Sequence, residues 1–223
     1  MSESEVVRIG LLGCGNVGAA LVDLVNDRAA AIAQRTGITL QVVKVAVRDT
    51  AKARNIDVPV VADVNAVVDD PNVDLVVEVM GGIEPARAAI TAALGKGKPV
   101  VTANKALLAE AGADLFRVAD VAGVDLLFEA AVAGGIPFIR PLRESLRGES
   151  IRRVMGIVNG TTNFILTKMT EEGADYAAVL AEAQKLGFAE ADPTADVEAF
   201  DAAAKCAVIA SIAFAADVSA GDV

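Results

Sequence analysis

The sequence predicts an α/β fold, in which a doubly wound parallel sheet is followed by a partial α+β domain. Short β-branched runs alternate with Ala-rich helical stretches through the first half, a pattern typical of βαβ units. A glycine-rich turn joins the first of these runs to a long helix. The alternation stops near residues 134–141. We therefore expect two domains, over residues 1–135 and 136–223.

The first domain is expected to contain six strands, each a mostly apolar run of the kind that a parallel sheet buries on both faces. The strands are predicted at 7–12, 40–47, 58–62, 73–80, 98–103 and 124–130. Helices are predicted at 18–35, 81–97 and 105–122. Pro85 near the start of the second helix and glycines at its end are typical helix boundaries.

The second domain departs from this rhythm. A connecting helix interrupted by Pro141 is expected over 136–148, and a new strand over 151–160. Two helices near 162–171 and 175–186 precede a loop and an apolar helix over 202–216. Because a lone strand cannot form a sheet, we expect this domain to be incomplete.

Composition excludes several classes of protein. A net charge of −10 argues against a nucleic-acid partner, and the apolar runs are shorter than the ~20 residues that span a bilayer. The acidic start, MSESEVV, lacks a signal-peptide pattern. Cys14 and Cys206 lack metal-ligand spacing, so we expect two small buried side chains in a reducing cytoplasm.

Missing residue types limit the acid–base chemistry. There is no histidine, and the single tyrosine, Tyr176, is followed four positions later by Leu180, which excludes a Tyr-x-x-x-Lys dehydrogenase site. Proton transfer must therefore depend on lysine, carboxylates or water.

The turn after the first strand has the dinucleotide-binding pattern G-x-G-x-x-G, over residues 13–18. The three glycines allow a tight turn, close approach of a pyrophosphate and close helix–strand packing, while the helix N-terminus supplies N–H donors. A plain structural turn is the alternative. We expect a Rossmann-type domain with cofactor contacts at Gly13, Gly15, Asn16, Val17 and Gly18.

Cofactor type should be determined at the end of the second strand. An acidic residue there favours NAD, whereas an arginine favours the 2′-phosphate of NADP. Arg48 comes first, with Lys52 and Arg54 close behind, so we favour NADP(H). Asp49 keeps NAD possible, and a solvated run of charges is the alternative.

Three further stretches carry candidate residues. Lys105 follows the fifth strand, where it could face the cofactor or simply begin a helix on the surface. Glu129 precedes a loop of small residues whose carbonyls suit a hard cation, although a plain turn is favoured on the residues alone. Gly160 permits close backbone approach, and either Thr161 or Thr162 is expected to cap the next helix.

The strongest candidates lie in the apolar helix. Between Glu198 and Asp217 the only charged residues are Asp201 and Lys205, four positions apart. A surface i,i+4 ion pair would need a polar face that this helix lacks. Because a buried lysine is costly unless paired, we expect the two to form a functional pair.

Together the motifs resemble the homoserine dehydrogenase family. They are GCGNVG, VVTANKALLA, EAAVAGGIPFIRPL, GIVNGTTNFIL and LGFAEADPTADVEAFDAAAK, in this order over essentially all 223 residues. The resemblance implies reversible conversion of L-aspartate 4-semialdehyde to L-homoserine with NAD(P)H, in the route to threonine, methionine and isoleucine. Family members continue into further strands that complete the substrate domain and a dimer, so a homodimer is expected at full length.

The resemblance also implies roles for individual residues. Lys205 would exchange a proton with the substrate, Asp201 and Glu190 would hold its ammonium and hydroxyl ends, and Lys105 would lie near nicotinamide and substrate. Asp196, Gly160 and Thr161 would line the substrate side, whereas Thr102 and Gly187 would contact the cofactor. A monovalent cation, usually sodium, would bind Glu129 and carbonyls of Val132, Gly134 and Ile136.

Two alternatives to this function differ in class. An aspartate-semialdehyde dehydrogenase needs a nucleophilic cysteine with a histidine, and the chain has no histidine. A chain that binds NADP(H) without turnover is the non-enzymatic alternative. An absorbance assay with NADPH and aspartate semialdehyde would separate the homoserine dehydrogenase function from this second alternative, which binding of the cofactor without turnover would support.

Overall fold

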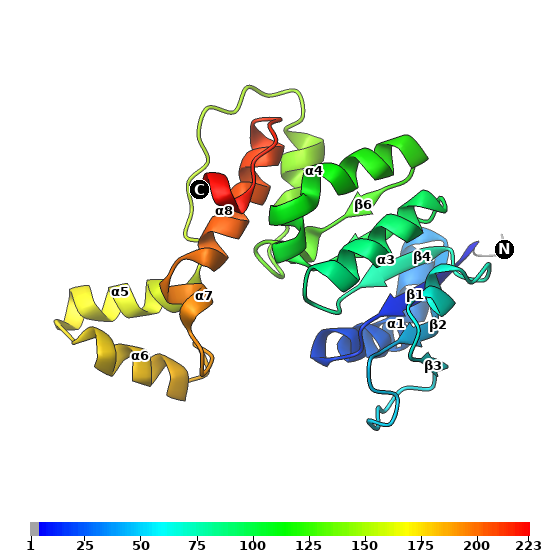
Figure 1. Ribbon diagram of the computed structural model, residues 1–223, viewed down its shortest axis with the longest axis horizontal. Coiled ribbons are helices and arrows are strands. Elements are labelled where there is room, and N and C mark those ends of the chain that lie inside the picture. Colours follow the sequence, from blue (N-terminus) through cyan, green and yellow to red (C-terminus); the bar gives the residue numbers. More distant parts are fainter. Residues whose placement is uncertain (1–4) are drawn as a thin grey trace. The chain divides into compact units, whose positions relative to one another are not determined.

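The computed structural model describes residues 5–223. Residues 1–4, which belong to the acidic start expected to lack a signal peptide, lie outside the described residues. The chain forms two compact units, one ending at Gly135 and the other covering Ile136–Val223, and each is described by itself (Figure 1). No described helix is long and apolar enough to cross a membrane.

The first unit is built on a six-stranded parallel sheet, which confirms the predicted fold class. Its strand order is β3-β2-β1-β4-β5-β6. The strands are β1 (Glu5–Leu12), β2 (Ile38–Ala46), β3 (Val60–Val61), β4 (Leu75–Glu78), β5 (Val100–Thr102) and β6 (Leu126–Leu127). The order reverses between β1 and β4, and in such sheets a ligand binds outside the carboxyl ends of the strands at that point.

Four helices connect these strands: α1 (Asn16–Thr36), α2 (Asn65–Val68), α3 (Glu84–Gly95) and α4 (Lys105–Ala122). The short α2 was not predicted. Several strands are shorter than their apolar runs. The predicted sixth strand is reduced to two residues, and its end forms instead the start of the 3₁₀ turn η1 (Glu129–Ala131). Apolar sequence therefore predicts burial in this unit better than it predicts strand pairing.

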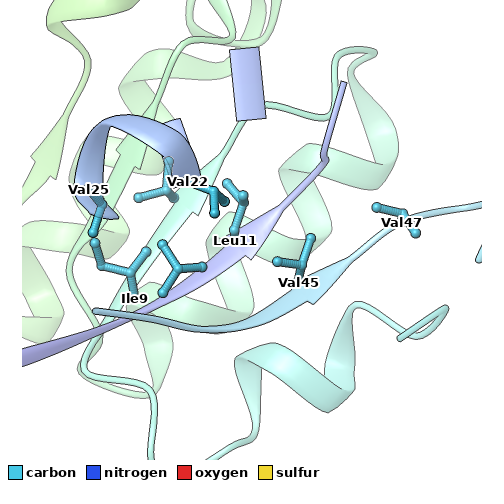
Figure 2. Packing of buried hydrophobic residues seen from close by; sticks show 8 residues of the cluster. Ile9, Leu11, Val22, Val25, Val45 and Val47 are labelled. Carbon is cyan, nitrogen blue, oxygen red and sulfur yellow. The ribbon is translucent and has the colours of Figure 1, made fainter. Parts of the chain in front are cut away.

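The core beside β1 holds α1 on the sheet. Ile9 and Leu11 alternate onto one face of β1, while Val22 and Val25 lie on one side of α1, and all four are almost fully buried. Figure 2 shows these side chains together with Val45 of β2. This packing fixes the start of α1 just beyond the carboxyl end of β1.

All regular secondary structure among the described residues of the second unit is helical. It contains the π-helical turn η2 (Pro141–Ser145), α5 (Gly160–Glu172), α6 (Tyr176–Lys185), α7 (Thr194–Val197), α8 (Phe200–Ala213) and η3 (Ala220–Asp222). Helices α5 and α6 pack through Ile165, Val179 and Ala183. The connecting helix expected over 136–148 is shorter than predicted, and Pro141 begins its π-helical turn and does not interrupt a longer helix.

The strand predicted over 151–160 is wrong, because residues 151–159 have no regular structure and Gly160 begins α5. No described strand of this unit is available to pair with the segment, so its backbone has no ladder to join. Met155 and Ile157 are 80% and 78% exposed. The β-branched pattern was real, but strand formation also needs a neighbour.

The two cysteines were expected to be buried, and this is also wrong. Cys206 is exposed and Cys14 only partly buried. Helix α8 buries one face, through Ala204, Ala207 and Val208, while other apolar side chains such as Phe200 remain outside. Cys206 lies off the buried face of α8.

Candidate active site

The glycine-rich turn lies at the switch point of the sheet. Gly13 has a φ of +96°, and a Cβ there would lie 2.7 Å from the carbonyl oxygen of Val79. A Cβ on Gly18 would collide with the carbonyl oxygen of Gly13, whereas one on Gly15 would meet nothing within 4 Å. The turn is therefore tight at its first and third glycines and open at its second, as a phosphate cradle requires.

Helix α1 presents its N-terminus at this open position. It begins at Asn16, and its N-cap residue, Gly15, provides no side-chain cap. Gly15, Asn16 and Val17 are exposed. Uncapped N–H groups and the helix dipole make this end suitable for an anion such as a pyrophosphate.

The loop after β2 is held against the glycine-rich turn by Arg54 rather than by Arg48. The Arg54 guanidinium donates to the carbonyl oxygens of Cys14 at 3.4 Å and Asp49 at 2.8 Å. Arg48 is exposed. Its side chain stands at the carboxyl end of β2, and a 2′-phosphate could pair with it there.

At the ends of β4 and β5, polar side chains are buried. Thr102 and Glu78 are fully buried, and the Thr102 hydroxyl donates to the Glu78 carboxylate at 2.6 Å. Asn104 caps α4 by accepting from Leu107 N–H at 3.1 Å, so Lys105 is the first residue of that helix. Thr102, expected to contact the cofactor, is thus engaged within the protein.

The loop predicted to hold a cation follows β6. Glu129 lies in η1, Val132 is buried, and both Ala133 and Gly134 have positive φ, at 64° and 57°. Ile136 is the first residue of the second unit and is 65% exposed. The described residues contain no cluster of three or more His, Cys, Asp or Glu side chains. A carboxylate beside a turning backbone suits a hard monovalent ion that takes carbonyl ligands.

In the second unit, Lys205 forms the expected pair with Asp201. The Nζ of Lys205 donates to Asp201 Oδ2 at 2.6 Å and to the carbonyl oxygen of Val158 at 2.5 Å. The two side chains are only 20% and 12% exposed. This is a largely desolvated pair within one helix, and not a surface ion pair.

Asn159 extends the pair into a network. Its Nδ2 donates to Asp201 at 2.9 Å and to Asp196 at 2.7 Å. The Thr161 hydroxyl is 2.9 Å from Asp196 and 2.6 Å from the carbonyl oxygen of Phe188. Three elements, α5, α7 and α8, are thereby joined around one lysine.

This network borders a cavity of about 690 Å³ within the second unit. Gly160, Thr161, Asp196, Asp201 and Lys205, all predicted as site residues, line it. Glu190 is exposed and is not among the lining residues, and its main-chain oxygen accepts from Gln184. Gly187, with a φ of +80°, lies just beyond the end of α6.

Sequence reasoning missed two features here. The predicted cap, Thr161 or Thr162, is wrong, because Asn159 is the N-cap and accepts from Thr162 N–H at 2.8 Å. Asparagine before Gly-Thr-Thr was the available signal, since it caps as well as threonine.

The second missed feature is Lys168, which lines another part of the cavity. It pairs with Glu182 at 2.7 Å, and this hydrogen bond raises the pKa of the lysine.

The sheet order and the glycine-rich turn place the first unit in the class of Rossmann-type dinucleotide-binding domains. Two family models match the chain: "Homoserine dehydrogenase, NAD binding domain" over residues 13–129, and "Homoserine dehydrogenase" over residues 137–223. The chain therefore belongs to the homoserine dehydrogenase family, as its motifs predicted.

Known relatives agree with this assignment. The chain is 54% identical to the homoserine dehydrogenase of Corynebacterium glutamicum over 98% of its length and 52% identical to that of Mycobacterium tuberculosis over 99%. It spans about half the length of the curated relatives it matches.

Among solved structures, a homoserine dehydrogenase from Thiobacillus denitrificans matches 97% of the chain with a TM-score of 0.91 and 46% identity, and 51% of that chain is covered. A hyperthermophilic archaeal homoserine dehydrogenase in complex with NADPH matches 93% of this chain with a TM-score of 0.81 and 30% identity, and 70% of that chain is covered.

Proposed function

We propose that the chain carries the reaction of its family, the reversible NAD(P)H-dependent interconversion of L-aspartate 4-semialdehyde and L-homoserine. The observation that carries the proposal is Lys205, held by Asp201 and the Val158 carbonyl at the wall of a cavity. With no histidine in the chain, this lysine is the best-placed proton donor of the second unit.

Lys205 acts as the general acid in the reducing direction. A bound nicotinamide supplies the hydride that reduces the aldehyde carbon. Lys205 donates its proton to the alkoxide that develops on the carbonyl oxygen, and in the reverse direction it takes that proton back. Asp201 fixes the position of the ammonium group and balances its charge within the largely desolvated site.

The substrate's own ammonium group requires carboxylates. Asp196 and Asp201 both face the cavity, and Asn159 holds them with one amide group. Gly160 and Thr161 begin α5 at the same wall, where main-chain N–H groups suit the substrate's carboxylate. The family resemblance assigns Glu190 to the same substrate, from the loop after α6.

The cofactor is held by the first unit. The open position at Gly15 receives the pyrophosphate, and Arg48 favours NADP over NAD. The resemblance adds Thr102 and Gly187 as contacts, and gives Lys105 a charge-stabilising role beside the reacting atoms. The structural neighbour solved with NADPH supports the phosphorylated cofactor.

Three further parts of the proposal follow from the family. A monovalent cation, sodium in the first instance, binds Glu129 and carbonyls of Val132, Gly134 and Ile136. The activity belongs to the biosynthesis of threonine, methionine and isoleucine. The full-length protein is a homodimer.

The test is turnover of the purified chain with NADPH and aspartate semialdehyde, followed through the absorbance of the reduced nicotinamide. We expect Lys205→Ala to reduce kcat by about a hundredfold or more while NADPH binding is unchanged, because the proton donor alone is removed. Lys96→Ala, a surface lysine of the first unit paired with Asp69, is the matched control and should retain full activity.

Near-normal turnover in Lys205→Ala would contradict the assignment of the proton donor. NADPH binding by the wild-type chain without any turnover would instead favour the non-enzymatic alternative.

A further inference from the structure

The buried carboxylate of Glu78 has no part in the chemistry proposed above. It ends β4, is fully buried, and accepts hydrogen bonds from Met80 N–H at 2.7 Å and from the Thr102 hydroxyl at 2.6 Å. Thr102 ends the neighbouring strand, β5. A carboxylate is costly to bury, and both of its oxygens are satisfied by donors from two different chain segments.

Asn104 completes the connection between these segments. Its main-chain N–H donates to Thr102 Oγ1 at 3.0 Å, and its side-chain Nδ2 donates to the carbonyl oxygen of Gly82 at 2.7 Å. Its Oδ1 caps α4, which begins at Lys105. The loop after β4, which includes Gly82, and the turn that leads into Lys105 are therefore cross-linked by side chains.

The position of this network in the sheet indicates which part of the cofactor it meets. In a sheet of this order the dinucleotide crosses the switch point between β1 and β4, with its pyrophosphate at the start of α1. The adenosine ribose lies at the end of β2, so the other mononucleotide falls to the side of β4 and β5. That mononucleotide carries the nicotinamide.

We propose that Glu78, Thr102 and Asn104 form one positioning unit that holds the β4 loop and the Lys105 turn in the geometry that receives the nicotinamide. Asn104 is its key positioning residue, because it alone both caps α4 and reaches the β4 loop. The inference rests on the dinucleotide site of the proposed function and extends it to residues outside the glycine-rich turn.

The test compares two ligands on the full chain: NADPH, and 2′-phospho-ADP-ribose, which is the same molecule without the nicotinamide. Asn104→Ser and Asn104→Asp both keep an oxygen that can cap α4 but lose the donor to Gly82. We expect each variant to weaken NADPH binding about tenfold while affinity for the fragment changes by less than about twofold. Glu78→Gln, which removes one acceptor without changing shape, should show the same selective loss.

A control and a fold check accompany these variants. Gly15→Val places a side chain in the open position of the cradle, so it should weaken both ligands alike. Thermal unfolding reports whether each variant is folded, and a loss of general stability would likewise weaken both ligands together.

Equal losses for NADPH and the fragment in the Asn104 variants would overturn the inference, as would equal affinity of the wild-type chain for the two ligands. The measurement does not depend on turnover. If the variants show the selective loss but the wild-type chain reduces no semialdehyde, the result would contradict the proposed function and support the positioning unit.

Discussion

A lysine within an apolar helix needs a reason to be there, and Lys205 has two. It is hydrogen bonded to Asp201 and to the Val158 carbonyl, and it borders a cavity that Asp196 and Thr161 share. Asn159 donates to Asp201 and to Asp196, so it links the carboxylate that pairs with Lys205 to a second carboxylate on α7. At this scale the site is a set of mutual hydrogen bonds around one cation.

At the residue scale, Arg48 should decide between the two nicotinamide cofactors. Replacing Arg48 with alanine removes the charge available to a 2′-phosphate, so affinity for NADPH should fall about tenfold while affinity for NADH stays the same. Calorimetric titration of both cofactors measures the difference. Arg35→Ala, in the last turn of α1, is the control and should change neither value.

At the scale of secondary structure, the candidate site residues lie at the N-termini of three helices. Helix α1 starts at the open glycine, α4 starts at Lys105, and α5 starts at the edge of the cavity. Helix starts leave N–H groups without partners, so they must be capped or be available to a ligand. α4 and α5 are capped by asparagines, whereas α1 is left uncapped where an anion is expected.

The cap of α5 should be worth more than an ordinary cap. Asn159→Ala removes the acceptor for Thr162 N–H and also leaves Asp196 and Asp201 facing each other without their shared donor. We expect a loss of about 2–3 kcal/mol in the free energy of unfolding, against about 1 kcal/mol for Asp175→Ala, which removes the cap of α6 alone. Denaturant titration compares the two, and equal losses would contradict the shared-donor role.

The contribution of the packing of α1 on β1 to the free energy of unfolding can also be measured. Leu11 is fully buried in the cluster that fixes the start of α1. Leu11→Ala should cost about 3 kcal/mol of unfolding free energy through the cavity it leaves. Exposed Leu24→Ala, on the outer side of α1, is the matched control and should cost well under 1 kcal/mol.

At the scale of the whole molecule, acid stability is linked to Asp70. The Lys44 ammonium hydrogen bonds to this carboxylate and lowers its pKa from 3.8 to about 2. A depressed carboxylate pKa stabilises the folded state above pH 3.8, and that contribution is lost as the pH falls toward about 2. Arg8 likewise lowers the pKa of Asp74, so the same acid window includes a second pair.

Asp70→Asn should therefore destabilise the chain at neutral pH and flatten its loss of stability between about pH 4 and pH 2. Unfolding measured at a series of pH values tests this. An unchanged acid slope in the variant would contradict the role of the Lys44–Asp70 pair.

The local sequence determined most of the first unit. Its βαβ alternation, the glycine-rich turn and the position of Lys105 at the start of a helix were all predictable, because each depends on neighbours in the chain. The Asp201–Lys205 pair was predictable for the same reason, since four residues of helix bring the two side chains together.

Contacts between distant segments required the tertiary structure. Nothing in the sequence around Asn159 indicates that it meets Asp196 and Asp201, 37 and 42 residues away. The burial of Glu78 with Thr102 depends on β4 lying beside β5, and the missing strand at 151–160 depends on the absence of a described neighbour. The sequence by itself determined the βαβ elements of the first unit and which cations need partners. Which groups become those partners was decided only by the folded chain, because hydrogen bonds select by distance in space and not along the sequence.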